Sequence, residues 1–419
     1  MRRLRDAVFV ALSAAAAAVG AVRGVRRTEP QRKGAVPARR RLRDAAILVA
    51  LLAALVAFAG VVVLVAGLVP INASSGHWGI TSRFLDFASD RSVATWSWKI
   101  AVPPALDDSA LVLKGAGHYE TGCKPCHGSP ELLRPRIAGG LTPPAPYLGP
   151  DLAKWDPAEL FYIVKNGIKF TGMPAWPSRH RDDEVWAMTA FLLKLPTLDA
   201  PTYARLVHGE APAPGVVPLG ELVGNAAVPT VVRESCGRCH GVDGRGRGTG
   251  AFPRLAGQRA AYLRGAMIAY ADGGRHSGIM EPIAAGVRED ELEAIAQFYA
   301  ALPPAAPQPP DAETGAAIAR GARIARRGVP EKLVPACAHC HGPTPDGHPT
   351  NENLPLLAGQ YANYLELQLE LFQGERRGGG AYAELMQHVA RQLSRDEMRD
   401  VALYYATLDP AQSPRALAP

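Results

Sequence analysis

All six cysteines of this chain lie in three copies of one short pattern, Cys-x-x-Cys-His. Two thiols three positions apart share one face of a helix, and the histidine follows them directly. This is the attachment signature of c-type haem, in which both thiols bond to the porphyrin and the histidine binds the iron. The sequence therefore predicts three covalent haem c groups. The attachment residues are Cys123, Cys126, Cys236, Cys239, Cys337 and Cys340, and the proximal iron ligands are His127, His240 and His341.

Three other uses of paired cysteines fit the pattern less well. A structural zinc site needs four ligands, usually from two cysteine pairs or from one pair with two spaced histidines. A thioredoxin-like redox pair occurs once, near a strand–helix–strand pattern. Neither of these uses, nor a disulfide framework, explains a histidine directly after every pair.

The length of 419 residues agrees with about three domains, one for each motif. Each domain has about a hundred residues, which is small for a protein core but sufficient when a buried haem supplies much of the apolar centre. Hydrophobic residues make up 47% of the chain, so the sequence is globular rather than disordered.

The positive charge of the chain is concentrated at its N-terminus. The net charge is +7, and residues 1–44 hold twelve Arg or Lys against three acidic residues, a net of +9. The remainder therefore carries −2 (7 minus 9), which argues against nucleic acid as a partner.

A long apolar segment follows this basic arm. Ala45–Val69 contains 25 residues without a charge, about 37 Å as a helix, and Pro70 is expected to end it. The arginine-rich flank fixes the cytoplasmic end of such a span. We therefore expect a single-pass protein of a bacterial inner membrane, with residues 1–44 in the cytoplasm and the haem domains in the periplasm.

An earlier apolar run, Ala7–Val22, leaves the start of the chain open. It has 16 residues, which is marginal for a span and closer in length to the core of a signal peptide. It is a second span, a signal-like segment or part of a mis-assigned start.

Residues 70–108 form a predicted periplasmic stem. Its tryptophans, Trp78, Trp96 and Trp98, fit either of two positions. They lie at the lipid headgroups, where amphipathic rings are favoured, or they pack on the first haem domain.

The first haem domain is predicted over residues 109–200. We expect helices at 115–120, at 156–166 with Asp156 as N-cap and Pro157 at the first helical position, and at 181–195. Met173 lies in a loop bounded by Gly and Pro and is the predicted sixth iron ligand. Met188 lies on the apolar stripe of the last helix and is expected in the core.

The second and third haem domains, residues 219–303 and 311–410, repeat each other. Pro253-Arg-Leu-Ala-Gly-Gln258 matches Pro355-Leu-Leu-Ala-Gly-Gln360, and the closing helices also match. Self-similarity at this spacing indicates a duplicated domain. We expect linkers at 199–218 and along the proline run 303–310.

The repeat also selects the remaining iron ligands. Met280 and Met386 each precede a closing helix by about eight residues, and we expect both to lie in loops and to bind iron. Met267 and Met398 fall inside helices and are expected to be structural. The alternative ligands at these two sites are His276 and His388.

These residues resemble the class I c-type cytochromes. The second and third domains look like the two-domain dihaem cytochromes that carry electrons to terminal oxidases, and the first looks like a separate monohaem domain. The resemblance implies an all-α fold of three tandem domains. It also implies that a proline carbonyl accepts the ring N–H of each proximal histidine, and by position these prolines are Pro150, Pro253 and Pro355. The stretch 225–235 departs from the family, so the first helix of the second domain is in doubt.

The implied function is electron transfer rather than catalysis. Three His/Met irons leave no open position for oxygen or peroxide, so we expect neither a peroxidase nor a small-molecule substrate. Expected partners are a haem-copper terminal oxidase, a cytochrome bc complex or a dehydrogenase. Two functions remain open: a carrier that passes electrons toward a terminal oxidase, or the cytochrome subunit of a membrane-bound dehydrogenase that oxidises alcohols, sugars or sugar acids.

Overall fold

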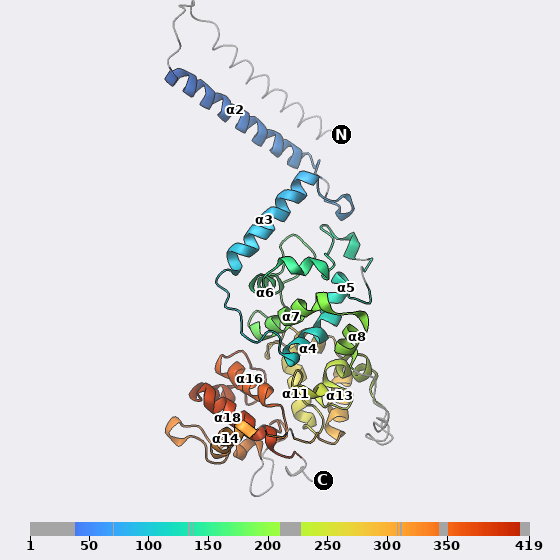
Figure 1. Cartoon of the computed structure of the whole chain (residues 1–419), viewed down its shortest axis with the longest axis vertical. Coiled ribbons are helices and arrows are strands. Elements are labelled where there is room, and N and C mark those ends of the chain that lie inside the picture. The colour runs from blue at the N-terminus through green and yellow to red at the C-terminus, as the bar shows by residue number, and fades with distance from the viewer. Residues whose placement is uncertain are drawn as a thin grey trace, which may run out of the picture. The chain divides into compact units, whose positions relative to one another are not determined.

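The computed structural model describes residues 38–69, 71–132, 135–136, 138–209, 228–307, 309–310, 312–342 and 351–410 (Figure 1). These residues form helices and isolated bridges without a sheet, which confirms the all-α prediction. The chain divides into two compact parts, residues 1–76 and residues 77–419. The predictions for the basic arm up to residue 37, including the apolar run at 7–22, lie outside the described residues.

The apolar segment forms the long helix α2, Ala38–Val65. Its residues 42–65 are the one stretch among the described residues with the length and composition to cross a bilayer, at about 36 Å. The expected end at Pro70 is wrong, because the helix stops five residues earlier. Gly67 has a φ of 66°, and Leu68 N–H donates to Val63 O while Gly67 N–H donates to Leu64 O. This left-handed glycine ends the helix by satisfying its last carbonyls.

The predicted stem contains a helix that the sequence analysis did not anticipate. This helix, α3, spans Gly79–Ser97 and buries Val93 and Ser97. Trp78, Trp96 and Trp98 are all exposed, so they do not pack on the first haem domain. Their position at lipid headgroups stays a prediction.

The first haem domain contains the three predicted helices and two additional ones. The helices are α4 Ser109–His118, α5 Lys124–His127, α6 Pro157–Asn166, α7 Asp182–Lys194 and α8 Ala200–His208. At α6, Asp156 occupies the N-cap and its backbone N–H donates to Glu159, as expected for a capped start. These elements enclose a core that includes Tyr119, Phe191 and Tyr203.

Helix α8 changes the expected boundary of this domain. The sequence analysis places a linker from Asp199, but Asp199 instead accepts a hydrogen bond from Thr202 N–H and caps α8. Tyr203 and Val207 are completely buried in the core of the first domain. The domain therefore extends to about His208, and the rest of the predicted linker lies outside the described residues.

The second and third domains each have their own core. The second contains α10 Gly237–His240, α11 Ala260–Ala271, α12 Met280–Ala285 and α13 Glu289–Ala301. The third contains α14 Gly315–Arg327, α15 Ala338–His341, α16 Ala362–Gln373, α17 Ala383–Gln392 and α18 Arg395–Thr407. In the doubtful stretch 225–235, the described residues begin at 228, and the chain is helical from 230 through the π-helical turn Val232–Cys236 into the cysteine motif.

The two repeats bind each other through an exchange of glutamines. Gln258 donates to Leu356 O (3.0 Å) and accepts from Leu356 N–H (2.9 Å). Gln360 donates to Arg254 O (3.0 Å) and accepts from Arg254 N–H (3.0 Å). Each glutamine thus satisfies the backbone of the same position in the other repeat, an arrangement with approximate twofold symmetry.

Helix packing in the first and third domains depends on a glycine at the crossing point. A Cβ at Gly115 of α4 would overlap the backbone of Ala187 in α7, and one at Gly321 of α14 would overlap the backbone of Asp400 in α18. These glycines let α4 touch α7, and α14 touch α18, backbone to backbone. By contrast, a Cβ at Gly315, also on α14, meets nothing within 4 Å.

Replacing Gly321 with Ala should therefore destabilise the third domain by about 1–3 kcal/mol, because the added methyl group forces α14 away from α18. Gly315→Ala is the matched control and should be neutral or stabilising by up to about 1 kcal/mol, because Ala favours the helix. Denaturant unfolding of the purified protein, followed by circular dichroism, measures both effects. Equal midpoints for the two variants would contradict this account of the crossing.

Candidate haem sites

The three cysteine motifs adopt one local structure. Each histidine ends a single helical turn, α5, α10 or α15, that begins within the motif. The next residue is a glycine with a positive φ: 73° at Gly128, 79° at Gly241 and 65° at Gly342. Only glycine adopts this conformation at low cost. The chain therefore turns away directly after each histidine, whose ring is left free to face a ligand.

Each proximal histidine is oriented by a proline carbonyl. The Nδ1 atoms of His127, His240 and His341 lie 2.9, 3.1 and 3.0 Å from carbonyl oxygens. Because a carbonyl only accepts, Nδ1 carries the proton and Nε2 is left with a lone pair for a metal. The carbonyls belong to Pro253 and Pro355 in the second and third domains, as predicted.

In the first domain the predicted proline is wrong. The acceptor is Pro146, and Pro150 instead begins a short 3₁₀ helix, Pro150–Lys154. The first domain has a longer segment between histidine and proline, 19 residues against 13 and 14, so spacing alone misleads. The Pro-x-Leu pattern of the other two domains does not separate the two candidates either, because it occurs both at Pro146 to Leu148 and at Pro150 to Leu152.

Burial keeps these histidines ready to bind a metal. Desolvation lowers the pKa of His127, His240 and His341, although the hydrogen bond to proline partly opposes it. A lowered pKa favours the neutral imidazole, which is the form that coordinates iron.

Burial disfavours the thiolate form of three of the motif cysteines. Burial raises the pKa of the Cys236, Cys239 and Cys337 thiols to about 11, whereas a reactive thiol needs a lowered pKa. All six cysteines are free of disulfides. Across the described ranges, no three His, Cys, Asp or Glu side chains come together in a metal-binding cluster.

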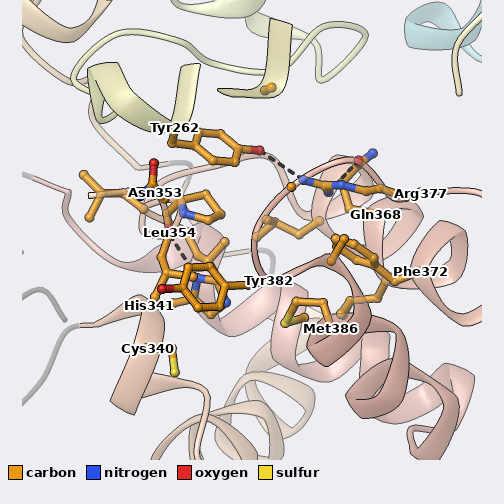
Figure 2. Close-up of a pocket in the computed structure, with 18 of the residues that line it drawn as sticks. Tyr262, Cys340, His341, Asn353, Leu354, Gln368, Phe372, Arg377, Tyr382 and Met386 are labelled. Carbon is orange, nitrogen blue, oxygen red and sulfur yellow. Dashed lines mark hydrogen bonds between the residues drawn. The ribbon is translucent and has the colours of Figure 1, made fainter. Parts of the chain in front are cut away.

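A cavity of about 530 Å³ lies beside the motif of the third domain, and residues of both the second and the third domain line it. Cys337, Cys340 and His341 line it together with Met386 of α17, and most of the other lining side chains are apolar (Figure 2). The volume and lining are those of a site for a cofactor or other small molecule. A haem attached through the two cysteines therefore fits this cavity.

Two buried arginines give the cavity a positive end. Arg275 of the second domain and Arg377 of the third line the cavity, and among the described residues no carboxylate lies within ion-pair distance of either. Arg275 donates to Tyr364 Oη, and Arg377 donates to Tyr262 Oη (Figure 2). Burial alone would raise the pKa of Tyr262. The two arginines outweigh burial and lower this pKa to about 8. Such a site favours an anion, and the propionate groups of a haem supply one.

Family models match all three domains. The model described as "Cytochrome C oxidase, cbb3-type, subunit III" matches residues 110–192 and 225–298, and the model described as "Cytochrome c" matches residues 318–409. A thiosulfate dehydrogenase electron acceptor of Stutzerimonas stutzeri is 41% identical over 178 residues, which cover 42% of this chain and 79% of the relative. The chain belongs to the class I c-type cytochromes.

Other relatives of this cytochrome are named cytochrome c4. Cytochrome c4 of Pseudomonas aeruginosa is 31% identical over 192 residues, which cover 45% of this chain and 92% of the relative. The solved structure of Acidithiobacillus ferrooxidans cytochrome c4 is 32% identical and covers 41% of this chain and 98% of its own, with a TM-score of 0.37. This cytochrome is thus an electron-transfer protein with three haem c sites.

The predicted sixth ligands lie outside the packed cores. Met173 is half-buried in a loop, as expected. Met280 and Met386 are also half-buried, but they lie on the short helices α12 and α17, so the expectation of loops is wrong for both. A residue on such a helix is held more rigidly than one in a loop. Met386 shares the third cavity with His341, which supports its assignment, while all three methionine ligands stay predictions.

The methionines predicted to be structural differ in their surroundings. Met188 and Met398 are 1% and 0% exposed and belong to the first and third cores. Met267 lies on α11. Leu369 occupies the equivalent position in the third domain, so this position does not need a thioether.

The alternative iron ligands, His276 and His388, have surroundings that differ from those of the predicted methionines. His276 is about two-fifths exposed and its ring lies 3.6 Å from Glu281, while its carbonyl accepts from Arg181 of the first domain. His388 is exposed, and it lies two residues from Met386 on α17, so the two point to different sides of the helix.

Oxidised protein should show the weak near-infrared absorption of methionine-bound ferric haem, at an intensity that corresponds to three sites. Met386→Leu should remove about a third of this absorption, because it removes one of three thioether ligands. Met398→Leu is the matched control from the same domain and should leave the absorption unchanged. If the control loses the band and Met386→Leu keeps it, the wrong sulfur has been assigned.

Proposed function

We propose that this cytochrome is a membrane-anchored relay that carries single electrons in the periplasm of a bacterium toward a haem-copper terminal oxidase. The observation that carries the proposal is the position of α2, which precedes all three haem domains and is long and apolar enough to span a bilayer. The basic residues on its N-terminal side favour a cytoplasmic start. The haem domains then lie on the exported side, where haem is attached to such motifs.

The chemistry of the sites supports a carrier. A neutral thioether favours ferrous iron over ferric iron, so His/Met ligation raises the reduction potential. A haem whose iron has a protein ligand on both faces exchanges electrons without binding a substrate. A tether adds to this role because it holds the haems near membrane-bound partners and raises their effective concentration.

The match of the first two domains to a cbb3-type oxidase subunit family supports an oxidase as the acceptor. A cytochrome bc complex is a compatible electron donor for such a relay. No small-molecule substrate is required at any of the three sites.

A second candidate function is the electron acceptor of a dehydrogenase. Two relatives, 41% and 38% identical, are named as thiosulfate dehydrogenase electron acceptors, and this chain covers 79% and 83% of their lengths. In this case the dehydrogenase delivers electrons to the haems. Dehydrogenases that oxidise alcohols, sugars or sugar acids are further donors of the same class.

Oxygen uptake by membranes that lack the native protein distinguishes these functions. With an artificial electron donor, the full chain should restore uptake, and a version that begins after Asp108 and is exported by a cleavable signal should be slower by roughly tenfold or more at equal haem, because the tether is lost. Full activity of the untethered version would make the anchor incidental. If artificial-donor respiration never depends on the protein but uptake driven by thiosulfate or an alcohol does, the dehydrogenase function replaces the oxidase function.

A further inference from the structure

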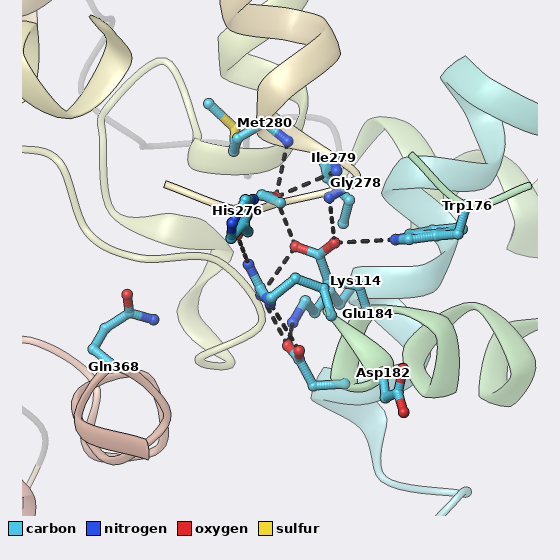
Figure 3. Close-up of polar contacts among 12 residues, drawn as sticks. Lys114, Trp176, Asp182, Glu184, His276, Gly278, Ile279, Met280 and Gln368 are labelled. Atoms are coloured by element: carbon cyan, nitrogen blue, oxygen red, sulfur yellow. Dashed lines mark hydrogen bonds and ion pairs between the residues drawn. The ribbon is translucent and has the colours of Figure 1, made fainter. Parts of the chain in front are cut away.

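A buried carboxylate joins the first haem domain to the second. Glu184, in the first turn of α7, is 2% exposed, and all four of its close partners are donors. Oε1 accepts from Ser277 Oγ (2.6 Å) and Arg181 Nη2 (2.9 Å). Oε2 accepts from Gly278 N–H (2.7 Å) and Trp176 Nε1 (3.2 Å). Two of these donors belong to the first domain and two to the second (Figure 3).

This contact links the segments that carry two predicted iron ligands. Trp176 lies three residues after Met173 in the first domain. In the second domain, Ser277 Oγ accepts from Met280 N–H (3.0 Å), so the serine that binds Glu184 also holds the start of α12. A side chain at Gly278 would overlap Trp176, so the two segments touch directly.

The same position behaves differently in the other two domains. Glu184, Glu291 and Glu397 all occupy the third position of a closing helix. Glu291 and Glu397 accept from the backbone N–H of Arg288 and Ser394 and so cap their own helices. Glu184 is instead directed at the neighbouring domain. The serine is also specific to the second domain, since Ala383 takes its place three residues before Met386.

Charge balance makes the contact specific. Arg181 is 6% exposed; it binds Asp183 through two nitrogens (2.8 and 2.9 Å) and donates to His276 O (2.7 Å). Lys114 binds Asp183 at 3.2 Å. The cations Arg181 and Lys114 neutralise the carboxylates of Asp183 and Glu184. Arg181 and Glu184 also form hydrogen bonds with residues 276–278 of the second domain. A buried carboxylate with four donors has no equal substitute, because an amide offers one acceptor oxygen and introduces a new donor.

Other contacts bring the first domain to the haem attachment side of the second. A Cβ at Gly117 of α4 would lie 3.1 Å from Cys239 Sγ. Arg247 of the second domain donates to the carbonyls of Leu206 (2.7 Å) and Arg205 (3.0 Å) at the end of α8. The first domain therefore contacts both the attachment cysteine and the Met280 segment of the second.

We propose that Glu184 is a positioning residue for Met280: through Ser277 it fixes the sixth-ligand segment of the second haem and docks the first haem domain on it. The three haem sites then form one fixed series, first to second to third, rather than a loosely tethered monohaem domain beside a dihaem pair. This inference rests on the assignment of Met280 as an iron ligand.

The test uses imidazole as a competing ligand for ferric iron in the purified full-length protein. Imidazole displaces bound methionine and abolishes the near-infrared absorption site by site. Met280→Leu identifies the third of the band that belongs to the second haem. In Glu184→Gln, this same third should disappear at an imidazole concentration at least tenfold lower than in the wild type, while the other two thirds titrate as before.

Two further variants make the outcome decisive. Ser277→Ala should act as Glu184→Gln does, and it decides the question alone if Glu184→Gln does not accumulate. Glu291→Gln, the matched carboxylate of the second domain's own closing helix, should titrate as the wild type. Wild-type titration of both Glu184→Gln and Ser277→Ala, or an equal effect of Glu291→Gln, would overturn the positioning role. A full band in Met280→Leu would overturn the ligand assignment on which it rests.

Discussion

Each haem domain of this protein is too small to supply a complete core from its own side chains, and the haem fills the difference. In the third domain a cavity of about 530 Å³ lies beside the motif, between α16, α17 and α18 of this domain and α11 of the second, so a domain of about a hundred residues leaves a large space beside its own core. Cys337, Cys340 and His341 line it and would hold the haem through two thioether bonds and the iron. Folding and function of this chain therefore both depend on haem attachment, because the cofactor is part of the core.

The geometry of each motif follows from a few local constraints. One helical turn places both thiols on one side, and a left-handed glycine then ends the turn. A proline carbonyl accepts a hydrogen bond from Nδ1–H and so leaves Nε2 for the metal. Because all three constraints are local in sequence or close to local, they recur in three domains with different surroundings.

The sequence predicts what depends on local pattern. The haem motifs, the all-α fold, the repeat, and the helices α6 and α7 all follow from spacing, capping and periodicity. Features that depend on distant contacts were missed. Counting across a loop of variable length gives Pro150 instead of Pro146. Helix α2 ends at Val65, before Pro70, because the left-handed Gly67 is as effective a stop. Helix α8 was missed because its apolar face is visible only when Tyr203 and Val207 are seen in the core.

The role of Glu184 shows the limit most clearly. In sequence it is an acidic residue in the first turn of a helix, like Glu291 and Glu397, and such residues usually cap or offset the helix dipole. Its partner Ser277 lies 93 residues further along the chain. Only the packing of the first domain on the second converts a common helix-start residue into an interdomain contact.

The central claim is that three haems are covalently built into one chain. Acidified-acetone extraction followed by intact-mass and metal analysis of the purified protein tests it most directly. The account predicts that no haem is extracted, that the mass exceeds that of the polypeptide by three haem groups, and that three iron atoms are present per chain. Extractable haem, a smaller mass increment, or zinc in place of iron would contradict it.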